Sequence, residues 1–169
     1  MELKTNFISR STGRRVDVWY KEVEDSKEIS HLDIYAVGAI CFYGEKMVIV
    51  YSDKKGAWSP PGGGVEKGEN FVEATIREVK EETNMKVLKQ KLIAIQIVTE
   101  PGVREIVQTV SVCVVEPYGP FVADMEEGGQ GDVTKIELID PLDYKKYFDW
   151  GANIDRTIVR ALEVIKELR

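Results

Sequence analysis

The sequence predicts an α/β protein in which a mixed β-sheet lies between helical layers. Runs rich in β-branched and apolar residues recur along the chain and are typical of strands. One helical pattern stands between these runs, and a second follows the last of them. Strands and helices in this order favour a sheet that is covered by helices.

The length and composition indicate one globular domain. The chain has 169 residues, of which 43% are hydrophobic and 31% are charged, as is usual for globular proteins. We expect residues 1–169 to form a single domain, with residues 1–30 as an N-terminal extension and a candidate for an added strand. The sequence contains no internal repeat, linker or low-complexity segment.

The charge and the apolar runs exclude two classes of partner. A formal net charge of −6 argues against a nucleic-acid polymer, because neutralising its phosphates requires clustered Lys and Arg. We expect no membrane partner, since no apolar run approaches the roughly 20 residues that span a bilayer. Met1–Arg10 lacks the apolar segment of a secretory signal, and Cys41 and Cys113 stand inside strand-like runs. These features favour the cytoplasm.

The first third of the chain predicts a strand and then a hairpin. Arg14–Tyr20 alternates in polarity, and residues 22–30 suggest an exposed polar connection. Ile34–Tyr43 and Met47–Tyr51 are two strands separated by a short turn. We expect Trp58 to pack under the glycine-rich turn that follows.

Three side chains in this region have open roles. Trp19 and Tyr20 fit the core, a contact in a homodimer, or a platform on which a base stacks, and we favour the core. His31 is the only histidine of the chain. A lone histidine beside a strand is more often structural or solvated than catalytic, so we assign it no role.

The stretch from Gly63 to Met85 combines a glycine turn, a helix start and a group of carboxylates. Asn70 is a good N-cap, and Glu73 three residues later can close a capping box, so the helix should begin near Phe71. Residues 60–64, Pro-Pro-Gly-Gly-Gly, predict a loop with unusual dihedral angles and close backbone approach.

Carboxylates gather on one side of this helix. With about 100° per residue, three of them fall within roughly one third of the circumference: Glu78, Glu81 and Glu82. An apolar stripe is centred away from them: Val72, Ile76 and Val79. We therefore expect the stripe to be buried and the carboxylate side to present clustered negative charge.

Such a cluster needs a compensating partner, because each like-charge pair destabilises an isolated helix by about 0.2–0.5 kcal/mol. Mg²⁺ takes oxygen ligands and is usually held by one or two carboxylates together with substrate phosphates. The alternative is a solvated acidic face in which Arg77 and Lys80 are interleaved.

The register of the whole stretch favours the metal site. Gly63, Glu69, Arg77-Glu78-Val79, Glu81-Glu82 and Met85 resemble the Nudix box, G-x5-E-x7-R-E-U-x-E-E-x-G-U, where U is bulky and apolar. One position departs: Asn84 stands where the family has glycine, and asparagine is the next best residue for a left-handed helix cap. The resemblance implies a Nudix α/β/α sandwich and hydrolysis of a pyrophosphate in a nucleoside diphosphate linked to another moiety.

The resemblance also implies Mg²⁺ or Mn²⁺ as cofactor and assigns roles to residues. It places the metal at five positions: Gly62, Gly63, Glu78, Glu81 and Glu82. Glu78 and Glu82 would be the principal ligands, and Gly62 would offer its backbone carbonyl. Arg77 would orient the carboxylates, and Glu69 would support the loop and the helix start.

The second half of the chain predicts two long strands, Val87–Val98 and Val103–Val115, a third at Val133–Ile139, and a helix at Asn153–Leu168. A polar loop covers residues 117–132, and loops of this length often carry function. Residues 140–147 suggest a turn or short helix.

The polar loop supplies candidates for the general base. Glu126 and Glu127 lie beside glycines that would let the segment close over substrate. Glu116 and Glu105 are weaker candidates, and Glu81 is the first alternative on the box helix.

The substrate is less specified than the chemistry. Pro101 stands at a spacing after the box that is similar to ADP-ribose pyrophosphatases, although Pro-Gly is also ordinary hairpin chemistry. ADP-ribose or a related nucleotide sugar is our expectation, with a nucleoside triphosphate as the alternative. From another class, a non-catalytic nucleotide-sensing module would keep the box shape and lose ligands.

Overall fold

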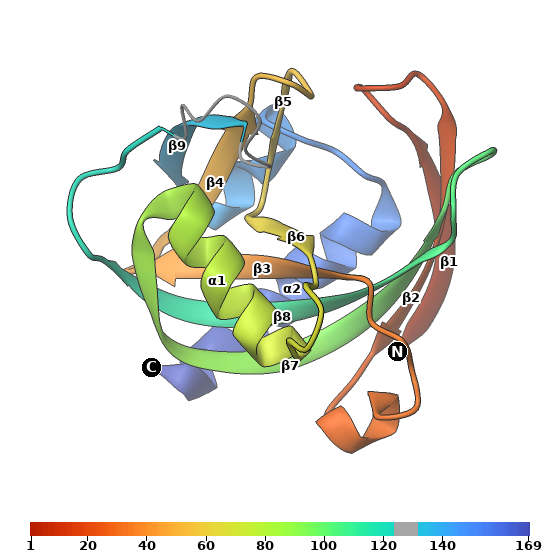
Figure 1. Cartoon of the computed structure of the whole chain (residues 1–169), viewed down its shortest axis with the longest axis horizontal. Helices are drawn as coiled ribbons and strands as arrows, with labels where there is room; N and C mark the ends of the chain where they lie inside the picture. Colours follow the sequence, from red (N-terminus) through yellow and green to blue (C-terminus); the bar gives the residue numbers. More distant parts are fainter. Residues whose placement is uncertain (124–131) are drawn as a thin grey trace.

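The computed structural model describes residues 1–123 and 132–169 (Figure 1). Its strands are β1 (Glu2–Ile8), β2 (Arg15–Glu22), β3 (Ala36–Tyr43), β4 (Lys46–Ser52), β5 (Ala57–Ser59), β6 (Gly62–Gly64), β7 (Met85–Thr99), β8 (Ile106–Pro117) and β9 (Val133–Ile139). Its α-helices are α1 (Phe71–Thr83) and α2 (Ala152–Leu168), and short 3₁₀ helices span Ser26–Ile29 and Pro141–Lys146.

Within the described residues, the strands form one mixed sheet. The order is β1-β2-β7-β8-β3-β4-β5, with β6 also paired to β3 and β9 to β4. β3 and β8 run parallel, and the other described pairs are antiparallel. In Figure 1 α1 lies in front of this sheet and α2 lies behind it. The predicted α/β/α sandwich around a mixed sheet is confirmed.

Two apolar clusters hold the layers together. Ile154, Ile158 and Ile165 of α2 pack with strand residues such as Phe42 and Ile93. On the other face, Val79 of α1 packs with a smaller set: Ala39, Cys41, Val48, Met85, Cys113 and Val115. Both cysteines are therefore buried free thiols, as the sequence indicated. None of the described helices has the length and apolar character needed to cross a membrane.

Residues 1–30 contribute more than the one strand that the sequence suggested. β1 and β2 form a hairpin, and β2 pairs with β7 inside the sheet. Tyr20 is fully buried, which fits the core role, whereas Trp19 is half-buried and donates a hydrogen bond to Glu2 (2.6 Å). The exposed connection expected at 22–30 is wrong in part, because Val23 and Ile29 are buried in a third apolar cluster.

The prediction of a loop at residues 60–64 holds for Pro60 and Pro61, but it is wrong for the three glycines. Gly62–Gly64 form strand β6, and none of its residues has a positive φ. The glycines are needed for close approach instead: a Cβ on Gly62 would lie 2.3 Å from the Val37 carbonyl oxygen. The expected close backbone approach is thus present, but in a strand.

Helix α1 begins and ends as predicted, yet of the expected apolar stripe only Val79 is buried. Val72 and Ile76 are 40% and 43% exposed, whereas Glu78 is only 8% exposed. The buried side consists of Ala74, Thr75, Glu78, Val79 and Thr83. The helix turns its carboxylates toward β6 because Gly63 leaves room there: a Cβ on Gly63 would lie 2.4 Å from Glu78 Oε1.

Candidate active site

The carboxylates of α1 line a cavity of about 250 Å³ between the helix and two strand ends. β6 forms its floor, the β4–β5 hairpin adds Lys54 and Lys55, and Asp132 closes one side. Glu78, Glu81 and Glu82 all contribute to the lining. The structure therefore brings the predicted metal-binding positions together around one space.

Arg77 organises this cluster. Its guanidinium donates to both carboxylate oxygens of Glu69 (2.8 and 2.9 Å), to Glu78 Oε1 (2.9 Å) and to Glu81 Oε2 (3.2 Å). Such planar, charge-assisted bonds fix both distance and orientation. The bond from Arg77 lowers the pKa of the Glu69 carboxyl to about 2. Arg77 thus holds the helix carboxylates and ties the loop before the helix to them.

The surroundings of Glu78 and Glu82 disfavour the charged forms of their carboxyl groups. Burial raises the pKa of Glu82 to about 8, and the charge of Glu78 adds to the shift. Burial also raises the pKa of Glu78, although Arg77 partly offsets it. Perturbed carboxylates of this kind cluster at functional sites.

The pairing of β6 with β3 decides which glycine carbonyls are free. Val37 lies opposite Gly63 in the antiparallel register. Backbone hydrogen bonds flank this pair two residues away on each side: Ala39 to Pro61, and Val65 to Tyr35. Because bonded pairs alternate along an antiparallel ladder, the N–H and C=O of Gly63 belong to the sheet.

The neighbours of Gly63 therefore point away from β3 and toward α1. The Gly62 N–H donates to Glu82 Oε1 (3.4 Å), and the Gly64 carbonyl accepts from Arg77 (2.8 Å). Of the three strand carbonyls, that of Gly62 is directed toward the cavity without serving the sheet or Arg77.

The donor set of this cavity fits a hard divalent cation. Two half-desolvated carboxylates and a backbone carbonyl are oxygen ligands, and one or two carboxylates suffice when substrate phosphates complete the shell. Across residues 1–123 and 132–169, no three acidic, histidine or cysteine side chains converge as a ready-made metal cage. The Arg77 bonds to Glu78 and Glu81 account for this, because they direct those carboxylates toward the guanidinium.

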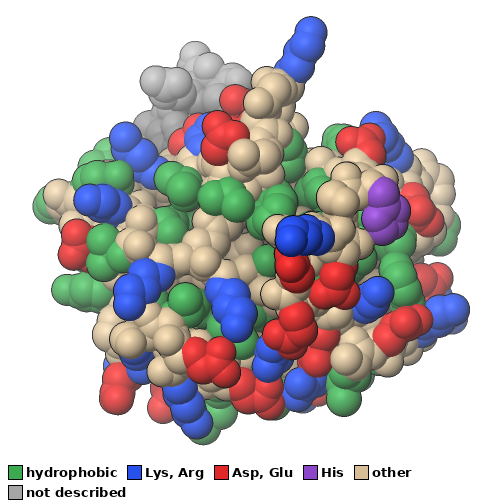
Figure 2. All heavy atoms as spheres, turned by 90° about the horizontal axis from the view of Figure 1, so that it is seen from below, with side chains coloured by type: hydrophobic (Ala, Val, Ile, Leu, Met, Phe, Trp, Pro, Cys, Tyr) green, Lys and Arg blue, Asp and Glu red, His purple; other side chains and the backbone are tan. Residues whose placement is uncertain are grey.

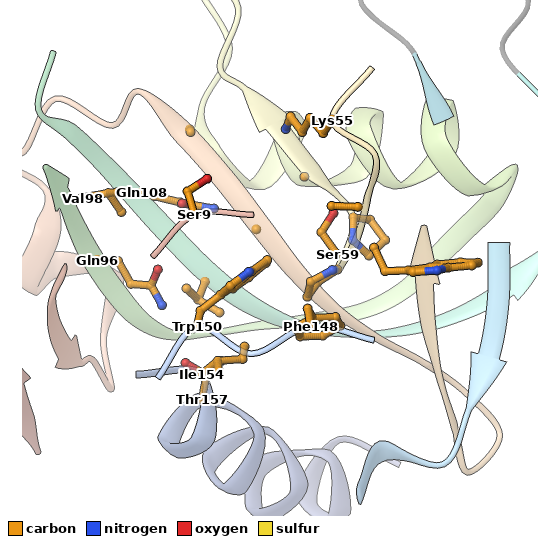
Figure 3. Close-up of a pocket in the computed structure, with 18 of the residues that line it drawn as sticks. Ser9, Lys55, Ser59, Gln96, Val98, Gln108, Phe148, Trp150, Ile154 and Thr157 are labelled. Carbon is orange, nitrogen blue, oxygen red and sulfur yellow. The ribbon is translucent and has the colours of Figure 1, made fainter. Parts of the chain in front are cut away.

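A second cavity of about 410 Å³ opens beside the first (Figure 3). The two share three lining residues, Lys55, Gly62 and Gly63. Aromatic side chains of Trp58, Phe148 and Trp150 line it, and its far wall comes from the β1–β2 hairpin. Its volume is within the range of small-molecule sites.

A family model of the NUDIX domain matches residues 33–160, which is more than half of the chain. The chain belongs to the Nudix family. It is accordingly a hydrolase that acts on pyrophosphate bonds. Nudix enzymes generally need divalent metal ions, in agreement with the oxygen donors of the smaller cavity.

Solved structures share the fold. The pyrophosphohydrolase BsRppH of Bacillus subtilis aligns with a TM-score of 0.63 at 21% identity, over 94% of this chain and 96% of its own. A NUDIX hydrolase of Nitrosomonas europaea gives 0.60 at 18% identity, over 78% and 90%. A MutT structure from work on Aliivibrio salmonicida and Vibrio cholerae gives 0.55 at 20% identity, over 77% and 97%. No curated protein gives a significant match.

Lys55 and Asp132 are among the residues of this Nudix site that were not singled out from the sequence. Lys55 lies on the polar loop after β4 and lines both cavities. Asp132 borders the carboxylates, accepts a hydrogen bond from Ser52, and its backbone carbonyl accepts from Asp53 (3.0 Å). Neither belongs to the box, so only the folding of the β4–β5 hairpin and β9 against α1 brings them there.

Other candidates lie elsewhere. Glu126 and Glu127 fall outside the described residues. Glu105, Glu116 and His31 are exposed and line neither cavity, and the single purple side chain on the surface in Figure 2 is His31. Pro101 lies in the turn between β7 and β8 and lines neither cavity, so the pockets lend no support to its spacing as a substrate signal.

Proposed function

We propose that this Nudix hydrolase cleaves the pyrophosphate of a nucleoside diphosphate linked to another moiety, with ADP-ribose or a related nucleotide sugar as the leading substrate. The continuity of the two cavities carries the proposal. The carboxylate cavity suits the pyrophosphate, and the aromatic cavity that shares Lys55 and Gly62 suits a nucleoside. A substrate that bridges them places its anhydride beside α1.

Five positions would contribute to a Mg²⁺ or Mn²⁺ site, in different ways. Glu78 and Glu82 are the principal ligands, Glu81 shares the site, and Gly62 contributes its carbonyl. Gly63 acts through its missing side chain, which leaves space for Glu78. When bound, the cation neutralises charge on phosphate oxygens and lowers the pKa of coordinated water.

The remaining residues position substrate and move a proton. Lys55 neutralises charge on the phosphates from the rim that both cavities share. Arg77 keeps Glu78 and Glu81 in place through its hydrogen bonds. The proton of the attacking water passes to a carboxylate other than the principal ligands Glu78 and Glu82, and Glu126 and Glu127 are candidates. Among the described residues the candidate is Glu81, whose side chain is 55% exposed.

Two other functions are distinguishable from this one. A nucleoside triphosphate would use the same carboxylates and leave the larger cavity for its base. A non-catalytic sensing module would have no use for the carboxylates, yet Glu78, Glu81 and Glu82 are all present and gathered. Their joint presence favours turnover.

A panel of ADP-ribose, other nucleotide sugars and nucleoside triphosphates with Mg²⁺ tests the proposal when the nucleoside monophosphate product is measured by chromatography. We expect the highest kcat/KM for a nucleoside diphosphate sugar. Glu78→Gln and Glu82→Gln should lower kcat by orders of magnitude. Glu73→Gln is the matched control, because glutamine also closes a capping box at the N-terminus of α1. Triphosphates at the top of the panel, or a fully active Glu82→Gln protein, would overturn the assignment.

A further inference from the structure

The floor of the larger cavity carries two glutamines side by side. Gln96 on β7 and Gln108 on β8 are directly opposed in the antiparallel register. Opposed residues project from the same face of a sheet, with Cβ atoms about 5 Å apart. Both line the cavity together with Ser9 of the β1–β2 hairpin, and Figure 3 labels all three.

These amides are exceptional on their face of the sheet. Two residues along, the next opposed pair is Ala94 and Val110, which are buried in the apolar core. On the other side the next pair is Val98 and Ile106. Among the described residues, neither glutamine side chain has a hydrogen-bond partner in the protein, although both are half-buried. Polar groups removed from water need partners, so this pair is suited to a ligand with a hydrogen-bonding edge.

Gly38 makes the arrangement possible. It lies on β3 beside Val110 of β8, and a Cβ there would lie 2.8 Å from Gln108 Nε2. The absence of a side chain at Gly38 therefore lets the Gln108 amide occupy that space. The glycine thus makes room for an amide that has no protein partner, as expected where a ligand is recognised.

We propose that Gln96 and Gln108 read the edge of an adenine base in the larger cavity and so select adenine nucleotides as substrates. Trp150 and Phe148, whose ring centroids lie 5.0 Å apart, supply aromatic surface beside the amides. The selection of substrates rests on the proposed pyrophosphohydrolase function; the recognition of the base itself does not.

The chemistry of the lining favours adenine. A glutamine amide pairs with N6 and N7 of adenine through one donor and one acceptor, whereas guanine prefers Arg or Lys and cytosine prefers a carboxylate. Among the lining residues that the structure describes, Arg10 and Lys55 carry charge. Lys55 lies at the end shared with the carboxylates, and Arg10 is on the exposed β1–β2 loop. The glutamines thus dominate base selection at the floor.

Isothermal titration calorimetry of the purified protein with free adenosine and with free guanosine, without added metal, tests the inference. Nucleosides carry no phosphate, so the readout is independent of the carboxylates and of turnover. We expect adenosine to bind about tenfold more tightly than guanosine. Gln96→Leu and Gln108→Leu should each weaken adenosine binding about threefold to tenfold and reduce the preference.

Matched variants separate the loss of the two amides from general effects of a substitution on packing. Gln90→Leu removes a β7 glutamine that bonds Ser111 outside the cavity, and it should leave the Kd for adenosine unchanged. Gly38→Ala keeps both amides and pushes only the flexible end of Gln108 aside, so the protein should fold and bind adenosine more weakly. In a Gln108→Ala background this added methyl should have no further effect.

The outcomes separate the inference from the function on which it builds. Equal binding of adenosine and guanosine by the wild-type protein, or unchanged adenosine binding in both leucine variants, overturns the inference even if nucleotides are hydrolysed. Selective adenosine binding that the glutamine variants abolish supports it, even if no pyrophosphate substrate is turned over and the proposed function fails.

Discussion

At the residue scale, Glu82 makes the stability of the metal-free protein depend on pH. Its pKa rises from the ordinary 4.5 to about 8 on folding, mainly through burial. Between these values the folded protein retains a proton that the unfolded chain has released. Stability therefore falls as pH rises over this interval, by an amount on the order of a few kcal/mol. Glu78 acts in the same direction.

Thermal unfolding in a chelator between pH 5 and 8.5 measures this effect. We expect Tm to decline across the range and Glu82→Gln to flatten the decline. Carboxyls with a lowered pKa, such as Glu22 and Asp155, act below pH 4.5 and leave this interval unaffected. Mg²⁺ should raise Tm most at high pH, because it binds the deprotonated form. A Tm that rises from pH 5 to 8.5 in chelator would contradict the assignment.

Asn84 tests the helix end at the same scale. The residue is left-handed, with φ 55° and ψ 36°, and its side chain donates to the Pro120 carbonyl (3.0 Å). Asn84→Gly relieves backbone strain but loses that bond, so we expect a change of about 1 kcal/mol or less. Asn84→Val, with a β-branched side chain at positive φ, should cost about 2 kcal/mol. Equal free energies of unfolding for the two variants would refute the cap.

The residues of the box were predictable because their chemistry is local. The capping box of Asn70 and Glu73, and the left-handed cap at Asn84, depend only on neighbours within one helix. Lys55 and Asp132 were not singled out, since their place beside Glu82 depends on how β4, β5 and β9 fold together. Residue spacing along the chain does not predict such long-range contacts.

At the scale of elements, the packing of β6 against α1 explains why an acidic helix side is buried. Sequence periodicity predicted Val72, Ile76 and Val79 as the inner face, but only Val79 of the three is buried. The hydrophobic pattern could not predict that a strand of glycines would pack against a carboxylate instead. The site thus overrides the apolar pattern that usually positions a helix.

Gly63→Ala tests this packing. The added Cβ would lie 2.4 Å from Glu78 Oε1, so it should displace the carboxylate, weaken Mg²⁺ binding at least tenfold and lower kcat. Gly64→Ala is the matched control, because nothing lies within 4 Å of its Cβ position and its φ is not positive. Titration of Mg²⁺ followed by Tm compares the two. If both variants bind Mg²⁺ like wild type, Gly63 has no part in positioning Glu78.

At the scale of the whole molecule, the N-terminal β1–β2 hairpin is an integral part of the sheet that carries the active site. The family match begins at residue 33, yet β2 pairs with β7 and the β1–β2 loop walls the larger cavity. The sequence indicated β2 by its alternation. It concealed β1, because the half-buried face of this strand carries only Leu3 and Phe7 as apolar residues and so leaves a weak hydrophobic pattern.

The last prediction follows from that integration: a chain that begins at Val23 should not fold. Val16, Val18 and Tyr20 are at most 4% exposed, and burying such side chains contributes about 1.5–3 kcal/mol each. Their loss, with the β2–β7 pairing and the ion pair between Glu22 and Arg156 of α2, approaches the total stability of about 5–15 kcal/mol that domains have. Arg10→Ala, at the exposed tip of the same hairpin, is the control and should keep Tm within about 2 °C. Circular dichroism during heating reads both, and a truncated chain with a cooperative, near-native Tm would make the hairpin a dispensable addition to the sheet.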